Sequence, residues 1–200
     1  MWHRDNQLKV GHTIPDKGTL DEMYIATLKD LLNGAGTVFP TKPDQDFTLL
    51  VDIKSANNMD AVWKSLVDAV APLRDGGWLS RWENGKFKKG KVTVVASGNA
   101  AKVFDKLNND QSNPGRAIFF DAILHGDLSN KDQSNTYLAS ADWKDAVDGD
   151  INRLRSQVKV AHEKGFKVRY CKHPSSPKNC GLALISRRGR SRRGLVATAS

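Results

Sequence analysis

The stretch Phe47-Thr48-Leu49-Leu50-Val51-Asp52-Ile53-Lys54 decides the fold class of this 200-residue chain. Its centre is a continuous apolar run, which is typical of a strand buried on both faces of a parallel sheet. Polar residues appear only at its end, where one residue separates Asp52 from Lys54. Because side chains alternate along a strand with a period of two, Asp52 and Lys54 should point to the same face.

Segments with strand and helix character alternate on both sides of this stretch. A capping box formed by Thr19 and Glu22 is expected to begin the first helix, and Asn33-Gly34 to end it. Pro72 is expected to end the second helix. Further strands are predicted at 8–10, 91–96, 117–121, 136–140 and 166–170, further helices at 100–107 and 151–161, and an Asn-Gly hairpin turn within 82–87. Repeated βα units predict a mostly parallel sheet with helices outside it.

Polar residues recur where the predicted strands end. They are His12, Asp52, Lys54, Ser97, Asp121, Ser140 and Arg169. The carboxyl ends of the strands form the active-site face of a TIM barrel, whereas no Gly-x-Gly-x-x-Gly motif supports a dinucleotide-binding sheet. Roughly six strands are predicted, and a full barrel has eight in ~250 residues. We therefore expect an α/β fold, an incomplete TIM (β/α) barrel over residues 1–170 with its N-terminal strands missing.

The last thirty or so residues, 171–200, break this pattern and are expected to form a disordered basic tail. The formal net charge is +9, and arginines concentrate in this tail, at Arg187, Arg188, Arg190, Arg192 and Arg193. Because the basic character belongs largely to the tail, no specific nucleic-acid partner is indicated. No apolar run approaches the roughly 20 residues that span a bilayer, so no transmembrane segment is predicted, and no signal peptide is evident.

The residues that could carry chemistry are His12, Asp52 and Lys54. A strand-end carboxylate can bind a hard cation, and a neighbouring lysine can hold a phosphate as a point charge. The alternative is that Asp52 and Lys54 form an ion pair with each other and bind no ligand. The spacing of the two residues alone favours this alternative. Histidine can protonate an alkoxide leaving group near neutral pH, although a histidine in a loop is more often inert.

Several motifs follow one another at a characteristic spacing. They are Leu-Lys-Val-Gly-His-Thr (8–13), Leu-Val-Asp-Ile-Lys (50–54), Ala-Pro-Leu-Arg-Asp-Gly-Gly-Trp-Leu (71–79), Val-Thr-Val-Val-Ala-Ser-Gly-Asn (92–99) and Ala-His-Glu-Lys-Gly-Phe-Lys-Val-Arg-Tyr (161–170). Together they resemble the altered inheritance of mitochondria protein 6 family, which belongs to the phospholipase-C-like and glycerophosphodiester phosphodiesterase superfamily. The resemblance implies a TIM-barrel phosphodiesterase domain over residues 1–170.

The resemblance also implies roles for individual residues. His12 is similar to the second of two acid–base histidines, and Lys54 to the phosphate-contacting lysine, so both are candidate catalytic residues. Asp52 is similar to the third carboxylate ligand of a divalent cation, Mg²⁺ or Ca²⁺. The family's first histidine and its Glu-x-Asp metal pair would precede Met1, so the expectation is a fragment that is hydrolytically inactive.

The implied function is that of a phosphoric diester hydrolase acting on a lipid or a glycerophosphodiester. The alternative is a non-catalytic binding protein that uses the barrel surface and the arginine-rich tail, and a third is a chain without a stable fold. The substrate, the oligomeric state and the localisation stay open. Relatives are often secreted or membrane-anchored, whereas no signal or anchor is expected in this chain.

Overall fold

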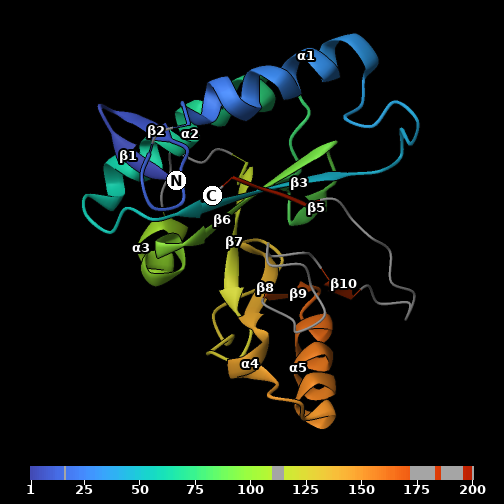
Figure 1. Ribbon diagram of the computed structural model, residues 1–200. Coiled ribbons are helices and arrows are strands. Elements are labelled where there is room, and N and C mark those ends of the chain that lie inside the picture. Colours follow the sequence, from blue (N-terminus) through green and yellow to red (C-terminus); the bar gives the residue numbers. More distant parts are fainter. Residues whose placement is uncertain (16, 110–114, 172–182, 186–195, 200) are drawn as a thin grey trace.

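The computed structural model describes residues 1–15, 17–109, 115–171, 183–185 and 196–199. Its centre is a curled sheet, a half-barrel of five parallel strands that pair in chain order (Figure 1). These strands are β3 (Phe47–Ile53), β6 (Val92–Gly98), β7 (Ile118–Ile123), β8 (Thr136–Asp142) and β9 (Lys167–Cys171). The predicted α/β class and the positions of these strands are confirmed.

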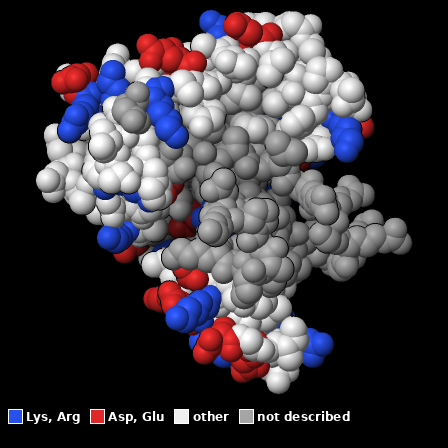
Figure 2. All heavy atoms as spheres, viewed as in Figure 1, with Lys and Arg blue, Asp and Glu red and all other residues white. Residues whose placement is uncertain are grey.

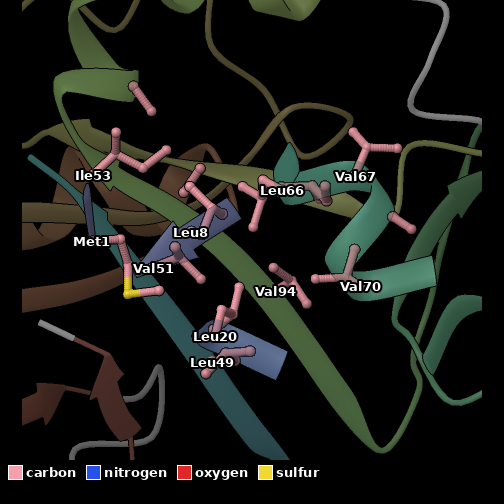
Figure 3. Packing of buried hydrophobic residues seen from close by; sticks show 14 of the residues in the cluster. Met1, Leu8, Leu20, Leu49, Val51, Ile53, Leu66, Val67, Val70 and Val94 are labelled. Carbon is pink, nitrogen blue, oxygen red and sulfur yellow. The ribbon is translucent and has the colours of Figure 1, made fainter. Parts of the chain in front are cut away.

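Two long helices, α1 (Ala26–Ala35) and α2 (Met59–Asp75), lie together on the outer side of β3 and β6 (Figure 1). Figure 3 shows Leu49 and Val51 of β3 in one cluster with Leu66 and Val70 of α2. These side chains are almost fully buried. Each large apolar side chain removed from water contributes about 1.5–3 kcal/mol, so this cluster holds β3 in place.

The helix boundaries differ slightly from the prediction. Thr19 and Glu22 form the expected capping box, in which the Thr19 N–H donates to Glu22 Oε2 (2.8 Å) and the Glu22 N–H donates to Thr19 Oγ1 (3.1 Å). A π-helical turn over Asp21–Ile25 then leads into α1. This helix ends not at Gly34 but at Gly36, whose left-handed backbone (φ 65°) directs its N–H to the Leu32 carbonyl.

Pro72 does not end α2, which continues to Asp75. Proline removes only one backbone donor, and the buried side chain of Leu73 keeps the last turn packed against the core. The helix ends at Gly76, whose N–H donates to the Pro72 carbonyl (3.2 Å).

The N-terminal strand prediction is only partly right. β2 (Gln7–Lys9) pairs with β1 (Trp2–Arg4) in a separate antiparallel hairpin, so it adds no strand to the half-barrel. Asp5 and Asn6 both have positive φ, as a tight two-residue hairpin turn requires. Met1 joins the hairpin to the sheet, because its α-amino group donates to the Asp52 carbonyl (2.5 Å) and the Lys54 N–H donates to the Met1 carbonyl (2.8 Å).

A second hairpin closes the amino-terminal end of the strands. Its strands are β4 (Arg81–Glu83) and β5 (Lys86–Lys88), and the predicted Asn84-Gly85 turn is confirmed. Phe87 lies against Phe119 of β7 and Tyr137 of β8, with ring centroids 5.5 and 5.8 Å apart. Aromatic rings therefore fill much of the interior of the half-barrel at this end, and a cavity of about 290 Å³ lies beside Phe87 and Tyr137.

The remaining helices cover the second half of the sheet. They are α3 (Phe104–Asn108), which follows a 3₁₀ turn over Asn99–Val103, α4 (Trp143–Ala146) and α5 (Ile151–Glu163). The predicted helices at 100–107 and 151–161 are confirmed within a few residues.

Two short strands within 171–200 differ from the prediction of a tail without regular structure. β10 (Ala183–Ile185) pairs antiparallel with β9, and β11 (Val196–Ala199) pairs parallel with β3. The edges of a sheet carry unpaired N–H and C=O groups that bind any available strand, which accounts for both additions. Most of the predicted tail, including Arg187 to Arg193, lies outside the described residues.

Replacing Thr19 with Ala removes one acceptor of the capping box, and we expect this change to lower the free energy of unfolding by about 1 kcal/mol. Urea denaturation of the variant and the parent measures the difference. Thr13→Ala, at an exposed loop position, is the matched control and should leave the transition midpoint unchanged. Equal stability of the two variants would contradict a role for this cap.

Candidate active site

A layer of polar side chains crosses the inner face of the half-barrel at the carboxyl ends of the strands. Leu50, Val95 and Leu138 form an apolar cluster on this face. The period of two places Asp52, Ser97 and Ser140 on the same face, one layer closer to the carboxyl ends. Asp121 of β7 and Arg169 of β9 join the layer through side-chain contacts. The sequence marks all five residues as polar strand ends, but it assigns a role only to Asp52.

Asp52 and Lys54 form the ion pair that their spacing allows. Lys54 Nζ lies 2.7 Å from Asp52 Oδ2, and both side chains keep more than a quarter of their surface exposed. Partly exposed pairs of this kind contribute little to stability. A ligand could therefore replace one partner of this ion pair at a small cost in free energy.

Gly98 makes room for the Asp52 carboxylate. A Cβ at this position would lie 2.3 Å from Asp52 Oδ1 and 2.5 Å from the Ile53 carbonyl oxygen, and φ is +68°. Glycine adopts this backbone conformation without steric cost. The carboxylate consequently leans from β3 onto the end of β6, where Ile53 pairs with Gly98.

Asp121 and Arg169 form the buried part of the polar layer. Arg169 Nη2 lies 3.5 Å from Asp121 Oδ2, and the side chains are only 10% and 4% exposed. Arg169 Nε donates to Ser140 Oγ (3.0 Å), and Ser97 Oγ donates to Asp121 Oδ2 (2.8 Å). These contacts link β6, β7, β8 and β9 across the interior.

Burial raises the pKa of the Asp121 carboxyl, and the nearby charge of Arg169 and the hydroxyl groups of Ser140 and Ser97 oppose this rise. The negative charge of Asp52 adds to it, so the two carboxylates act on one another. Among the described residues, no well-formed hydrogen bond reaches the buried Asp121 Oδ1. A buried carboxylate oxygen without a partner is costly, and at a strand end it is typical of a functional site.

His12 is exposed in the loop that follows β2. No hydrogen bond or ion pair joins it to Asp52 or Lys54 among the contacts of the described residues. The structure thus joins Asp52 and Lys54 directly, whereas the role of His12 stays a prediction.

A divalent cation fits two of the carboxylates in this layer. The described residues contain no group of three or more His, Cys, Asp or Glu side chains that could enclose a metal. Mg²⁺, however, is commonly held by one or two carboxylates together with water and substrate phosphate. Asp52 at the end of β3 is a partly exposed carboxylate of this kind.

The charges on the surface are mixed. On the face that Figure 2 shows, Lys and Arg side chains of the described residues lie among Asp and Glu side chains. In the described part of the chain, no helix has the length and apolar character needed to cross a membrane. Because the charges on this face are mixed, the polar layer inside the half-barrel is the candidate site.

A half-barrel of parallel strands with charged residues at their carboxyl ends is the arrangement of α/β-barrel enzymes. Comparison with known proteins identifies the family more closely. Residues 1–121 match the sequence model of the AIM6-like phosphodiesterase domain, so the chain belongs to this family. The predicted resemblance is confirmed.

A relative from the fungus Arthroderma benhamiae is described as an altered inheritance of mitochondria protein 6 homolog. It is 29% identical over 202 residues, which cover 86% of this chain and 62% of the relative. The chain thus spans less than two thirds of the length of that protein. No solved structure matches the chain.

Gly98→Ala should lower the free energy of unfolding by about 2–4 kcal/mol, because the new Cβ meets both a strained backbone and two oxygen atoms. Gly36→Ala is the matched control, since Gly36 also has a positive φ but open space around its Cα. Thermal unfolding of both variants separates backbone strain from the clash at Asp52. Equal losses in the two variants would show that the space beside Asp52 does not matter.

Arg169→Met should cost about 3–5 kcal/mol at neutral pH, because it leaves the Asp121 carboxylate buried without its cation. A carboxyl whose folded pKa is raised binds more protons in the folded state, so its contribution to stability is lost as pH rises through that pKa. The variant should therefore regain stability as the pH is lowered. Denaturation at several pH values measures this slope.

The double variant Arg169→Met with Asp121→Asn removes both charges and is the control for the single change. It should be more stable at neutral pH than Arg169→Met alone and should show a smaller pH slope. A double variant as unstable as the sum of the single changes would contradict coupling between the two residues.

Proposed function

We propose that this chain is a phosphodiester-binding domain of the phosphoric diester hydrolase class, with a lipid or a glycerophosphodiester as its ligand. The observation that carries the proposal is the Asp52–Lys54 pair at the carboxyl end of β3, in a domain of a phosphodiesterase family. In this proposal the half-barrel is part of a TIM (β/α) barrel.

Lys54 is proposed to hold a phosphate oxygen. Its ion pair with Asp52 is partly exposed and weak, so a phosphodiester monoanion can take the place of the carboxylate. Hydrogen bonds to charged groups contribute about 1.5–3 kcal/mol, which is enough for millimolar binding together with contacts from the groups around it.

Asp52, with Asp121, would hold the divalent cation, Mg²⁺ or Ca²⁺. When bound, such an ion supplies positive charge that stabilises the phosphoryl oxygens. In this proposal the phosphate binds beside Lys54, at the end of the strands opposite the packed rings of Phe87, Phe119 and Tyr137.

His12 is the proposed general acid that protonates the leaving oxygen. It is exposed in the loop after β2, where it can exchange protons with solvent or with a bound ligand. Catalytic hydrogen bonds often form only when substrate is bound. We propose that this chain binds phosphodiesters beside Lys54, with His12 as the candidate general acid.

The second candidate is a non-catalytic binding protein. Asp52 and Lys54 form an ion pair with each other. The pair is therefore equally consistent with a protein that has no catalytic role. Its proposed cationic tail, residues 187–193, lies outside the described residues. Loss of salt-sensitive nucleic-acid binding on deletion of residues 187–193 would favour it.

Lys54→Met should weaken the binding of glycerophosphocholine by about tenfold or more, because it removes the cation that holds the phosphate. Phosphorus NMR titration of the full chain measures the affinity. Lys64→Met is the matched control, since Lys64 also forms an ion pair with an aspartate, Asp68, but lies on the exposed face of α2. Equal affinity in both variants would refute the proposed phosphate site.

Any hydrolysis of bis(p-nitrophenyl) phosphate should fall by a factor of ~10² to 10⁴ in His12→Ala, as expected for loss of a general acid. His125→Ala, at another exposed loop position, should leave the rate unchanged. Turnover that survives His12→Ala would refute the assignment of the general acid, while leaving the binding result for Lys54 intact.

A further inference from the structure

A cavity of about 290 Å³ lies at the amino-terminal end of the strands, opposite the polar layer. Its lining includes Asp46, which precedes β3, and Lys167, which begins β9. Phe87 of β5 and Tyr137 of β8 also line it, and both rings are only half-buried. The two rings stack, with centroids 5.8 Å apart and planes inclined by 20°. Half-buried rings beside a cavity provide apolar surface that a ligand can cover.

A β-bulge places Tyr137 on the inner face of the half-barrel. Phe120 and Asp121, which are consecutive in β7, pair with Thr136 and Leu138 of β8. Tyr137 lies between these two pairs as the extra residue of β8. Strict alternation would put Tyr137 on the face opposite Leu138, but Tyr137 packs against the inner-face cluster that contains Leu138. A bulge redirects a side chain at the expense of strand pairing, and bulges are frequent beside functional sites.

Lys167 gives the cavity a positive charge that its lining does not neutralise. Lys167 pairs with Leu138 in the register of the sheet, which places it on the same inner face. Its ammonium group lies 4.5 Å from the centre of the Tyr137 ring and donates to the Tyr137 hydroxyl. In the described part of the chain, no carboxylate pairs with Lys167, whereas Lys89 of the same cavity pairs with Asp46 at 2.9 Å. The lining therefore carries a net positive charge.

We propose that this cavity binds a small aromatic carboxylate, whose ring packs against Phe87 and Tyr137 and whose carboxylate accepts hydrogen bonds from Lys167. An ammonium group can donate more than one hydrogen bond, and the Tyr137 hydroxyl accepts only one. An apolar cavity of about 150 Å³ holds benzene. The cavity beside Phe87 is therefore large enough for an aromatic ring system with a charged substituent.

The charge and the rings of the cavity select for this class of ligand together. A neutral aromatic molecule would leave Lys167 without an anion, and an aliphatic carboxylate would lack the offset or edge-to-face contacts that aromatic rings favour. A monoanion matches the net charge of the lining. Because this cavity and Lys54 lie at opposite ends of the strands, the inference goes beyond the proposed function and does not depend on it.

The test is an NMR titration of the full 200-residue chain with naphthoate, its neutral amide and its fully hydrogenated carboxylate analogue. The backbone amide signals of β8 and β9 report binding. We expect naphthoate to bind saturably, and the other two compounds to bind at least several-fold more weakly, because each lacks one of the two features that the cavity recognises.

Lys167→Met should weaken naphthoate binding by about tenfold or more, because it removes the cation and keeps an unbranched side chain. Lys86→Met is the matched control, since Lys86 is an exposed lysine of the same hairpin as Phe87 but does not line the cavity. Asp46→Asn should tighten binding several-fold, because it releases Lys89 from its ion pair. This variant replaces Lys167→Met if thermal unfolding shows that Lys167→Met does not fold.

Equal affinities of Lys167→Met and Lys86→Met for naphthoate would overturn the inference, as would an Asp46→Asn variant that binds no more tightly than the parent chain. Equal or tighter binding of the amide or of the hydrogenated analogue would overturn the ligand class. Absence of saturable binding at roughly 10 mM naphthoate, above the millimolar range of weak specific binding, would overturn the site itself. Binding of glycerophosphocholine that depends on Lys54 is measured separately and would survive each of these failures.

Discussion

The parallel pairing of β3 with β6 is the constraint on which the candidate site depends. The pairing runs over the whole length of both strands, from Phe47 with Val92 to Ile53 with Gly98. Because α2 and the N-terminal segment pack against the outer face of these strands, a shift by one residue would exchange the apolar and polar faces. The hydrophobic core therefore fixes the register, and the register fixes where Asp52 lies relative to Ser97.

The inner polar layer costs stability that the core has to offset. Buried ion pairs seldom gain as much from mutual attraction as their groups lose on leaving water. Arg169 and Asp121 lie in the interior, and in the described part of the chain no well-formed hydrogen bond reaches Asp121 Oδ1. An apolar layer at this level would pack more simply, as Leu50, Val95 and Leu138 do one layer below. A polar layer that weakens the fold is more readily explained by chemistry than by stability.

The pattern of the sequence predicts the half-barrel well, since buried parallel strands have an apolar signature that does not depend on distant residues. The Asn84-Gly85 turn and the Thr19–Glu22 cap are local in the same sense. The hairpin of β1 and β2 could not be predicted, because its turn uses Asp5 and Asn6 rather than a glycine. The strands β10 and β11 form only because sheet edges are available, which depends on the whole fold.

The candidate site also contains some contacts that the sequence predicts and others that depend on the fold. Asp52 and Lys54 are two residues apart, so their pairing follows from the strand period. Asp121 and Arg169 are far apart in the sequence and meet only because β7, β8 and β9 are neighbours in the sheet. The sequence marks both residues as polar strand ends, but their mutual pairing and the unpartnered oxygen are properties of the folded chain. Only a structure could reveal them.

Exposure divides the polar layer into two parts with different tasks. Lys54 and Asp52 are 30% and 26% exposed, whereas Arg169 and Asp121 are 10% and 4% exposed. Electrostatic interactions strengthen as water is excluded. The buried ion pair of Arg169 with Asp121 is therefore stronger than the partly exposed pair of Lys54 with Asp52. A ligand that arrives from solvent meets Lys54 first and can displace Asp52 from it. The charges of the buried pair stay fixed, so the β3 side is where the proposed ligand would bind.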